Sequence, residues 1–387
     1  MPDDILDRAR RYHDELTEFR LDIHAHPELG LEQHRTAERV AAKLAEIGVE
    51  VHRGVGKTGV VGVLRNGDGP SIGLRADMDA LPIEEQTNLP YSSRNAGRMH
   101  ACGHDGHTTM LLGAAKYLAD TKNFHGTVNF IFQPGEEGIG GALAMLDDKL
   151  FQRFPCDAIF GMHNRPGMPV GQYAISPGAG MAGGAFFDIA ITGKGAHGAR
   201  PEESVDSVLV ACHIGTALQS IVARNVPPQD MAIVSVTRIL AGDAYNVIPQ
   251  TATMGGTVRT LKRETMQLIE ANMKRVASHV AAGFGAEATV DFRVIFAPLV
   301  NDADHARDFA DAAADLVGEA KVNRNKPPAN ASEDFSFMLE QVPGAYINLG
   351  NGEDSAAVHN PAYNFNDAAI PYGVALFASI VERKLPK

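Results

Sequence analysis

The hydrophobic positions of the first fifty residues follow a helical period. Apolar side chains recur every three or four positions over Ile5–Ile23, which predicts an amphipathic helix that ends before Pro27. A second helix is expected over about Thr36–Ile47, because Gly48 is a typical residue just beyond a helix C-terminus.

Beyond these helices the period changes to that of strands. Apolar runs predict strands over residues 59–64 and 71–75, joined as a hairpin by a turn at residues 66–69. Helices and strands then alternate, which predicts an α/β layered domain. The expected elements are a helix over 108–118, a strand over 127–132, a helix over 140–146 and a strand over 158–162.

A glycine-rich stretch at residues 178–184 predicts a domain boundary. The following pattern is strand 186–192, helix 204–222, strands 231–240 and 252–259, helix 264–284 and strand 287–296. This β-α-β-β-α-β order is that of a ferredoxin-like unit. The first pattern then resumes with a helix over 303–317, a strand over 345–349 and a closing helix. We therefore expect a two-domain α/β protein with a mixed sheet, in which residues 1–183 and 296–387 form one domain and residues 184–295 form an inserted α+β domain.

Composition and charge narrow the class of protein. The chain has 387 residues, a net charge of −12 and a pI of about 5.7, which argues against nucleic acid as a partner. No apolar run approaches the roughly 18 residues of a membrane helix. The chain starts with an acidic segment, residues 1–4, that leads into a helix, so no signal peptide is expected. Three sparse cysteines, Cys102, Cys156 and Cys212, fit no disulfide framework. We expect a cytoplasmic protein with a reduced Cys102.

The candidate chemistry begins at Cys102 and His104, which are separated by Gly103. Both side chains could face one metal ion if the backbone turns at the glycine. A buried structural cysteine, or a nucleophilic Cys–His pair, are the alternatives for an isolated motif of this kind. The metal interpretation gains weight only because carboxylates and two more histidines lie where further ligands are needed.

Those further candidates are Glu136, Glu137, His163 and His359. The two glutamates follow a wholly apolar strand and a Pro-Gly turn, so one could bind metal while the other faces a water. Each histidine follows a short apolar strand and would more often be structural if it stood alone. Together with Cys102 the histidines are better explained as ligands.

Asp77 and Asp79 also follow a predicted strand, and ligand crevices in α/β sheets lie beyond the carboxyl ends of strands. Of the two, we favour Asp79 as the carboxylate that orients a ligand. His197 and Asn246 lie in the inserted domain and could reach substrate when the domains close. The sequence around Lys194 lacks the spacing of a P-loop.

The chain resembles the M20 metallopeptidases, and most closely their branch of aminoacylases, hippurate hydrolases and auxin-conjugate amidohydrolases. The resemblance extends along the whole chain. The matching stretches are HAHPELG (24–30), LRADMDALP (74–82), HACGHDGHTTMLLGAA (100–115), FQPGEEG (132–138), GMHN (161–164), GKGAHGARP (193–201), AYNVIP (244–249), SEDFS (332–336) and VHNP (358–361).

This resemblance implies a dinuclear site with ligands Cys102, His104, Glu137, His163 and His359. It also implies that Glu136 is the general base, and that the inserted domain is a lid that dimerises and supplies His197 and Asn246 to the substrate. Zinc or manganese is expected, and nickel or cobalt could also occupy such a site.

The expected reaction is hydrolysis of a small-molecule N-acyl amino acid by a homodimer or larger homo-oligomer, with no nucleic acid or membrane as a partner. An N-acetyl-diaminopimelate-type deacetylase, a dipeptidase, and a non-catalytic metal-bound peptide receptor are the alternatives. Other branches of the family carry a histidine at the position of Asp77, so Asp77 is not expected to be a ligand.

Overall fold

The computed structural model describes residues 4–387, and residues 1–3, which form part of the acidic start, lie outside the described range. The chain divides into two compact units. One consists of the chain up to Gly180 with Val300–Pro327 and Asp334–Lys387, and the other of Met181–Leu299 with Pro328–Glu333. The division predicted from the sequence, and the roles given to its two domains, remain predictions.

The first unit is built on a mixed eight-stranded sheet with the order β1-β2-β4-β3-β5-β16-β6-β15. Its four central strands are parallel, since β3 pairs in parallel with β4 and β5, and β16 pairs in parallel with β5. The strands are β1 (Glu50–Val55), β2 (Gly59–Asn66), β3 (Ser71–Asp77), β4 (Gly126–Gln133), β5 (Ala158–Arg165), β6 (Tyr173–Ala174), β15 (Val322–Asn323) and β16 (Gly344–Gly350).

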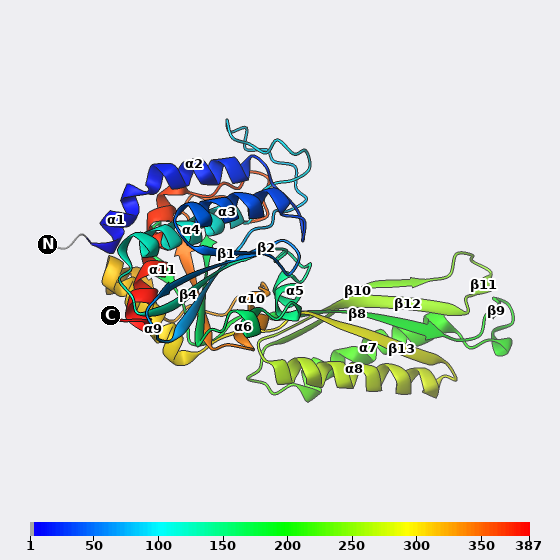
Figure 1. Cartoon of the computed structure of the whole chain (residues 1–387). Coiled ribbons are helices and arrows are strands. Elements are labelled where there is room, and N and C mark those ends of the chain that lie inside the picture. The colour runs from blue at the N-terminus through cyan, green and yellow to red at the C-terminus, as the bar shows by residue number, and fades with distance from the viewer. Residues whose placement is uncertain (1–3) are drawn as a thin grey trace. The chain divides into compact units, whose positions relative to one another are not determined.

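Helices cover both faces of this sheet (Figure 1). The larger core lies on one face, where alternate strand residues such as Phe130 and Phe160 pack under the helices α1 to α4, α9 and α11. The opposite face is covered by α5, α6 and α10. The helices are α1 (Ile5–Arg11), α2 (His13–His24), α3 (His34–Glu46), α4 (His104–Thr121), α5 (Gly141–Asp147), α6 (Leu150–Arg153), α9 (Ala303–Val317), α10 (Phe335–Leu339) and α11 (Ile370–Lys384), with short 3₁₀ turns η2 (Glu319–Lys321) and η3 (Asp367–Ala369).

The second unit has a four-stranded antiparallel sheet with the order β10-β12-β8-β13. With α7 and α8 along one face, it has the β-α-β-β-α-β topology expected of a ferredoxin-like unit (Figure 1). The main elements are β8 (Gly183–Thr192), α7 (Ser207–Asn225), β10 (Ala232–Ala241), β12 (Thr251–Thr260), α8 (Arg263–Gly283) and β13 (Glu287–Phe296). The short elements are β9 (Ala196–His197), η1 (Pro201–Glu203) and β11 (Val247–Ile248). The strands β7 (Gly178–Met181) and β14 (Leu299–Asn301) contain the positions at which the chain leaves one unit and enters the other.

Helix α7 is long and apolar enough to cross a membrane by length and composition alone, which the sequence analysis did not anticipate. Its apolar stripe, Val210, Ile214, Leu218 and Ile221, is buried in the core of the second unit. The amphipathic pattern of a helix packed on a sheet therefore accounts for its hydropathy.

The mixed α/β fold class is confirmed, and the topology of the second unit is consistent with the expected ferredoxin-like insertion, but the predicted hairpin is wrong. β2 and β3 do not pair with each other, because β4 lies between them, antiparallel to β2 and parallel to β3. The turn sequence suits a hairpin, yet β3 is buried on both faces, as an inner strand of a parallel sheet is. The strand β1 was not predicted.

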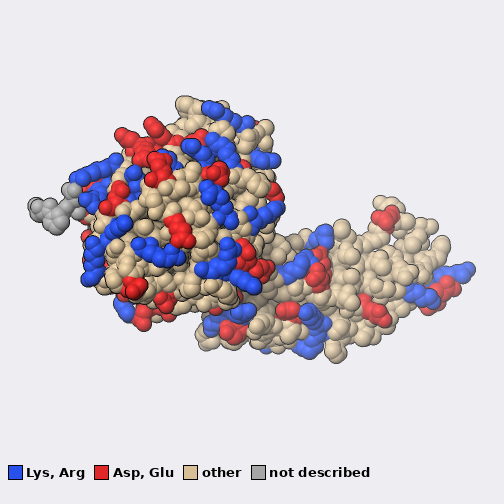
Figure 2. All heavy atoms as spheres, in the orientation of Figure 1, with Lys and Arg blue, Asp and Glu red and all other residues tan. Residues whose placement is uncertain are grey.

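Basic and acidic side chains are interspersed over the face of the first unit that Figure 2 shows. Such mixing gives no extended field of one sign on that face.

Candidate metal centre

The parallel strands bring the predicted site residues to one edge of the sheet. Asp77 ends β3, and Asp79 follows it by two residues. Glu136 and Glu137 follow β4, which is the neighbour of β3. His163 lies near the end of β5, which is the other neighbour of β3. The sequence pattern predicted that His163 comes just after β5. Because the strands run in the same direction, their carboxyl ends meet there.

Cys102 and His104 approach this edge from the start of α4. The helix begins at His104, four residues before the predicted start, and Gly103 precedes it with a φ of +90°. A Cβ atom at position 103 would lie 2.3 Å from Nδ2 of Asn164. Only glycine therefore allows both the turn and the close approach of the backbone to Asn164.

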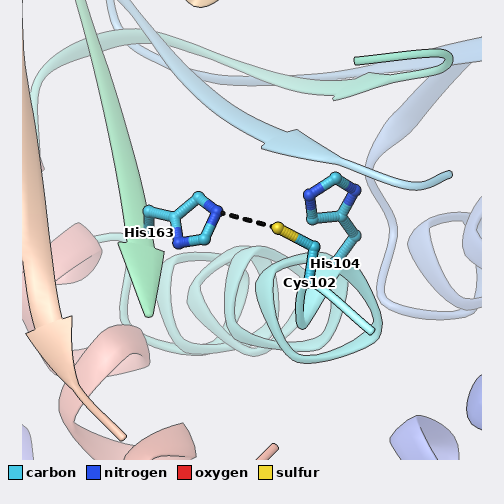
Figure 3. A group of neighbouring side chains, drawn as sticks. All are labelled: Cys102, His104 and His163. Carbon is cyan, nitrogen blue, oxygen red and sulfur yellow. Dashed lines mark hydrogen bonds between the residues drawn. The ribbon is translucent and has the colours of Figure 1, made fainter. Parts of the chain in front are cut away.

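His163 presents one ring nitrogen to the Cys102 thiol (Figure 3). Its Nδ1 lies 2.6 Å from the carbonyl oxygen of Asn164, and its Nε2 lies 3.4 Å from Sγ of Cys102. A proton on Nδ1, donated to the carbonyl, leaves the lone pair of Nε2 directed at the thiol. Burial lowers the pKa of His163 to about 3, so the imidazole is neutral, as a ligand must be.

Asp79 ties three parts of the site together. Its Oδ1 accepts a hydrogen bond from the backbone N–H of Glu136, and its Oδ2 accepts one from the N–H of Glu137, both at 3.0 Å. Its Oδ1 also lies 3.2 Å from Nδ1 of His104. One carboxylate thus sets the direction of both glutamates and fixes the ring of a histidine.

The environment of the second ring nitrogen of His104, Nε2, indicates whether the site suits a cation. The ring is fully buried, and among residues 4–387 its Nε2 has no hydrogen-bond partner. A buried polar atom without a partner is costly. Since Nδ1 is held by Asp79, the lone pair on Nε2 fits a metal ion.

His359 closes the site from the loop that follows β16. The residue is held at a φ of +64°, a left-handed conformation that is uncommon for a side chain with a Cβ. Its backbone N–H donates to the carbonyl oxygen of Ala101 at 2.7 Å, which attaches this loop to the Cys102 segment. Its Nε2 lies 3.2 Å from Oε1 of Glu137. Contacts with Cys102 and Glu137 raise the pKa of His359 to about 10.

The predicted ligands, together with Glu136, fall into overlapping groups of three. In each group the nitrogen, sulfur or oxygen atoms lie within 4.8 Å of one another. The groups are Cys102 with His104 and His163, Cys102 with Glu137 and His359, and His104 with Glu136 and Glu137. A thiolate, imidazoles and carboxylates so arranged form a donor set for divalent cations such as zinc.

Glu136 is buried beside this donor set. Its Oε1 accepts a hydrogen bond of 3.4 Å from the backbone N–H of Asp334, just before α10. Asp334 is itself anchored by Arg75, and its Oδ2 accepts a hydrogen bond from the N–H of Ala142. The position of Glu136 therefore depends on a segment almost two hundred residues away in sequence, which no local pattern revealed.

His107 is a neighbour of the site that was not predicted from the sequence. Its Nδ1 lies 2.6 Å from Oδ1 of Asp77, and its Nε2 accepts a hydrogen bond of 3.0 Å from the backbone N–H of Asn164. Both ring nitrogens have partners, which suits a supporting role for His107, although its ligand atom also lies within 4.8 Å of those of Asp77 and His104. The i, i+3 spacing of His104 and His107 on one helix was the available signal.

A second buried network lies behind the first turn of α4 and was also missed. Asp105 accepts from Arg20 at 3.0 Å and lies 2.8 Å from Nδ1 of His24, and all three side chains are fully buried. Contacts with Asp105 and Glu85 outweigh burial and raise the pKa of His24 to about 9. Charge pairing inside the protein thus fixes the start of the helix that carries His104.

The two residues predicted to contact substrate lie together in the second unit. His197 ends β9 and pairs with Val247 of β11. The backbone N–H of Gly198 donates to the carbonyl oxygen of Asn246 at 2.8 Å, and the side chains of His197 and Asn246 are exposed. Their role at the substrate remains a prediction.

The place of Asp79 yields a first testable prediction. In Asp79→Asn an NH₂ group replaces one of the two carboxylate oxygens. One of the backbone N–H groups of Glu136 and Glu137 therefore loses its acceptor and faces another donor. We expect cation retention to fall by about 10- to 100-fold, the cost of losing such a supporting partner. Metal content after dialysis against graded chelator measures this.

The matched control for this prediction is Asp68→Asn, on an exposed turn. Equal retention by the Asp79 variant and the control would show that Asp79 does not support the site.

A mixed α/β sheet with a thiol, imidazoles and carboxylates gathered at its parallel strand ends is an arrangement that suits a metal-dependent hydrolase. Residues 73–383 match Peptidase family M20/M25/M40. The chain belongs to this family, and it is a hydrolase that acts on amide bonds.

Individual relatives agree with this family. The chain is 45% identical over 373 residues to a hippurate hydrolase of Campylobacter jejuni, covering 96% of this chain and 97% of the relative. It is 40% identical over 375 residues to an N-acetylcysteine deacetylase of Bacillus subtilis, with coverage of 96% and 97%. Its structure is similar, with a TM-score of 0.85 and 36% identity, to the crystal structure of a Bacillus subtilis dinuclear metal binding peptidase from the M20 family, covering 97% of this chain and 99% of that one. The predicted branch of the family is confirmed.

Proposed function

We propose that this metal-dependent N-acyl amino acid amidohydrolase uses Cys102, His104, Glu137, His163 and His359 to hold two divalent cations, with Glu136 as the general base. The hippurate hydrolase and deacetylase relatives support the substrate class. The observation that carries the assignment of roles is the group of His104, Glu136 and Glu137, whose ligand atoms lie within 4.8 Å of one another. A buried carboxylate that close to a ligand set can reach both a cation and a water.

The five proposed ligands would hold the two cations, which would polarise the amide carbonyl and lower the pKa of a bound water. The oxygen of the attacking water bonds to the amide carbon, and Glu136 accepts a proton from that water. The same carboxyl then gives that proton to the leaving nitrogen as the C–N bond breaks. The N–H of Asp334 holds one Glu136 oxygen during both transfers. The products are a carboxylic acid and a free amino acid.

We assign the second unit the role of a lid and a dimerisation module. His197 of that unit would stabilise the developing oxyanion, and Asn246 would bind substrate. Apolar side chains are exposed on α7 (Val208, Leu209) and on the edge strand β10 (Ile239, Leu240), where a second copy could cover them. A cytoplasmic location suits the free thiol of Cys102.

The preferred cation follows from the donor types. Thiolate and imidazole donors favour zinc, while the carboxylates admit manganese, and nickel or cobalt could replace either. Metal analysis of the purified protein distinguishes these cases.

The proposed function is tested by measuring hydrolysis of a panel of substrates with and without chelator. The panel contains N-benzoylglycine, N-acetylcysteine, an N-acetylated diamino acid and a dipeptide. We expect N-acyl amino acids to be cleaved, activity to disappear with chelator, and zinc or manganese to restore it. Preference for the diamino acid would indicate a deacetylase of the N-acetyl-diaminopimelate type, and preference for the dipeptide would indicate a dipeptidase. Binding of the panel without any turnover would identify a receptor instead.

A further inference from the structure

Arg165 is a cation beside the candidate metal centre that the mechanism does not use. It is the last residue of β5 and stands two positions after His163. Successive side chains in a strand alternate between faces, so Arg165 lies on the same face of the sheet as His163, about 7 Å further along the strand. Its side chain is exposed, and within residues 4–387 it forms no ion pair.

Lys326 is a second cation of the first unit, and the charge of Arg165 acts on it. It follows β15 by three residues, and its backbone N–H donates to the carbonyl oxygen of Ile175 at 3.3 Å. The side chain is partly buried, and it has no acidic partner in the described part of the chain. Burial and the charge of Arg165 together lower the pKa of Lys326 to about 8. The positive charge of Arg165 therefore acts on Lys326.

Two arginines on neighbouring elements have acidic partners. Arg324, two residues before Lys326, forms ion pairs with Asp311 at 2.8 Å and with Glu319 at 2.7 Å. Arg307 of α9 pairs with Asp304. Placing two like charges together, one of them partly desolvated, is unfavourable unless an anion completes the arrangement. No acidic side chain in the described part of the chain pairs with Arg165 or Lys326, so an anionic ligand would complete the arrangement.

The spacing suits the substrate class. In an N-acyl amino acid, three bonds separate the scissile carbonyl carbon from the carboxylate carbon, a span of about 4 Å. A guanidinium two residues beyond the proposed ligand His163 can reach that carboxylate while the amide stays at the metal centre. Asn348 of β16 pairs with His163 in the register, is partly exposed, and adds an amide to the same face.

We propose that Arg165 and Lys326 bind the α-carboxylate of the amino-acid half of the substrate and so select N-acyl amino acids over neutral amides. This assignment rests on the function proposed above and extends it to the part of the substrate that leaves as product. A guanidinium can grip a carboxylate with two parallel hydrogen bonds, while the lysine adds a point charge.

The test compares kcat/KM for N-benzoylglycine and for N-benzoylglycinamide, which differ only in the carboxylate. The amide is assayed at high enzyme concentration. The variants are Arg165→Gln and Lys326→Met, and Lys321→Met is the matched control, since Lys321 is exposed and lies in the same segment. We expect the ratio of acid to amide to fall by roughly 10- to 100-fold in each variant, the effect of removing a charged hydrogen bond. The loss should appear as a higher KM for the acid with kcat preserved.

Three results separate the possible failures. If the variants keep the wild-type ratio, or lose activity on both substrates equally while retaining cations, the carboxylate assignment is wrong. If the metal-loaded wild type cleaves neither compound nor any other N-acyl amino acid, the proposed function itself fails. Arg165→Lys keeps the charge and should recover part of the preference, which a merely structural role for Arg165 would not produce.

Discussion

Glu136→Gln is expected to lower kcat by at least about 10²- to 10⁴-fold while both cations stay bound. The amide has nearly the shape of the carboxylate, so the hydrogen bond from the Asp334 N–H can persist. It cannot, however, accept a proton from water. The loss therefore falls on the chemical step and leaves substrate binding largely intact.

Steady-state kinetics with metal analysis of the same samples measures this effect. Glu353→Gln, an exposed glutamate of the loop that follows β16, serves as the control. A Glu136 variant with the wild-type kcat would remove Glu136 from the role of general base. A variant that had lost its cations would instead make Glu136 a ligand.

Cys102→Ala should remove cations and activity together. Cys102 belongs to two of the three-residue groups, one with His104 and His163 and one with Glu137 and His359. Loss of its sulfur therefore weakens both halves of the site. We expect activity at limiting metal to fall by more than the roughly 100-fold that loss of a supporting partner costs.

The measurement is metal stoichiometry by elemental analysis, with activity titrated against added zinc and manganese. Cys212→Ala, a free and exposed cysteine on α7, is the control. Two tightly held cations per chain in the Cys102 variant would contradict the assignment of its thiol as a ligand.

The sequence predicted most elements of the fold because their patterns are local. The strand at Glu287–Phe296 and the helix at Ala303–Val317 have the predicted bounds. The edge at which the candidate ligands gather was also predictable, because parallel strands end at the same side of a sheet. The pairing of β2 and β3 was not, since a turn sequence says nothing about a strand that arrives sixty residues later and separates its two neighbours.

The supporting contacts of the site were beyond sequence reasoning for a similar reason. The bond from the Asp334 N–H to Glu136, and the bond from Asn164 to His107, join segments with no shared pattern. Buried charges such as Arg20 and Asp105 look like surface residues in a sequence, because their partners lie elsewhere in the chain. Candidate ligands were recognisable by residue type, whereas the groups that orient them required coordinates.

The attachment of the His359 loop to Ala101 bears on how the protein matures. The proposed donors are contributed by positions as early as Cys102 and as late as His359, and the loop that carries His359 follows β16, which pairs with β5. A nascent or mispaired chain would expose a thiol and imidazoles without completing a high-affinity chelate. Complete cation binding would then require the two distant segments to be joined first, as the bond from His359 to Ala101 joins them.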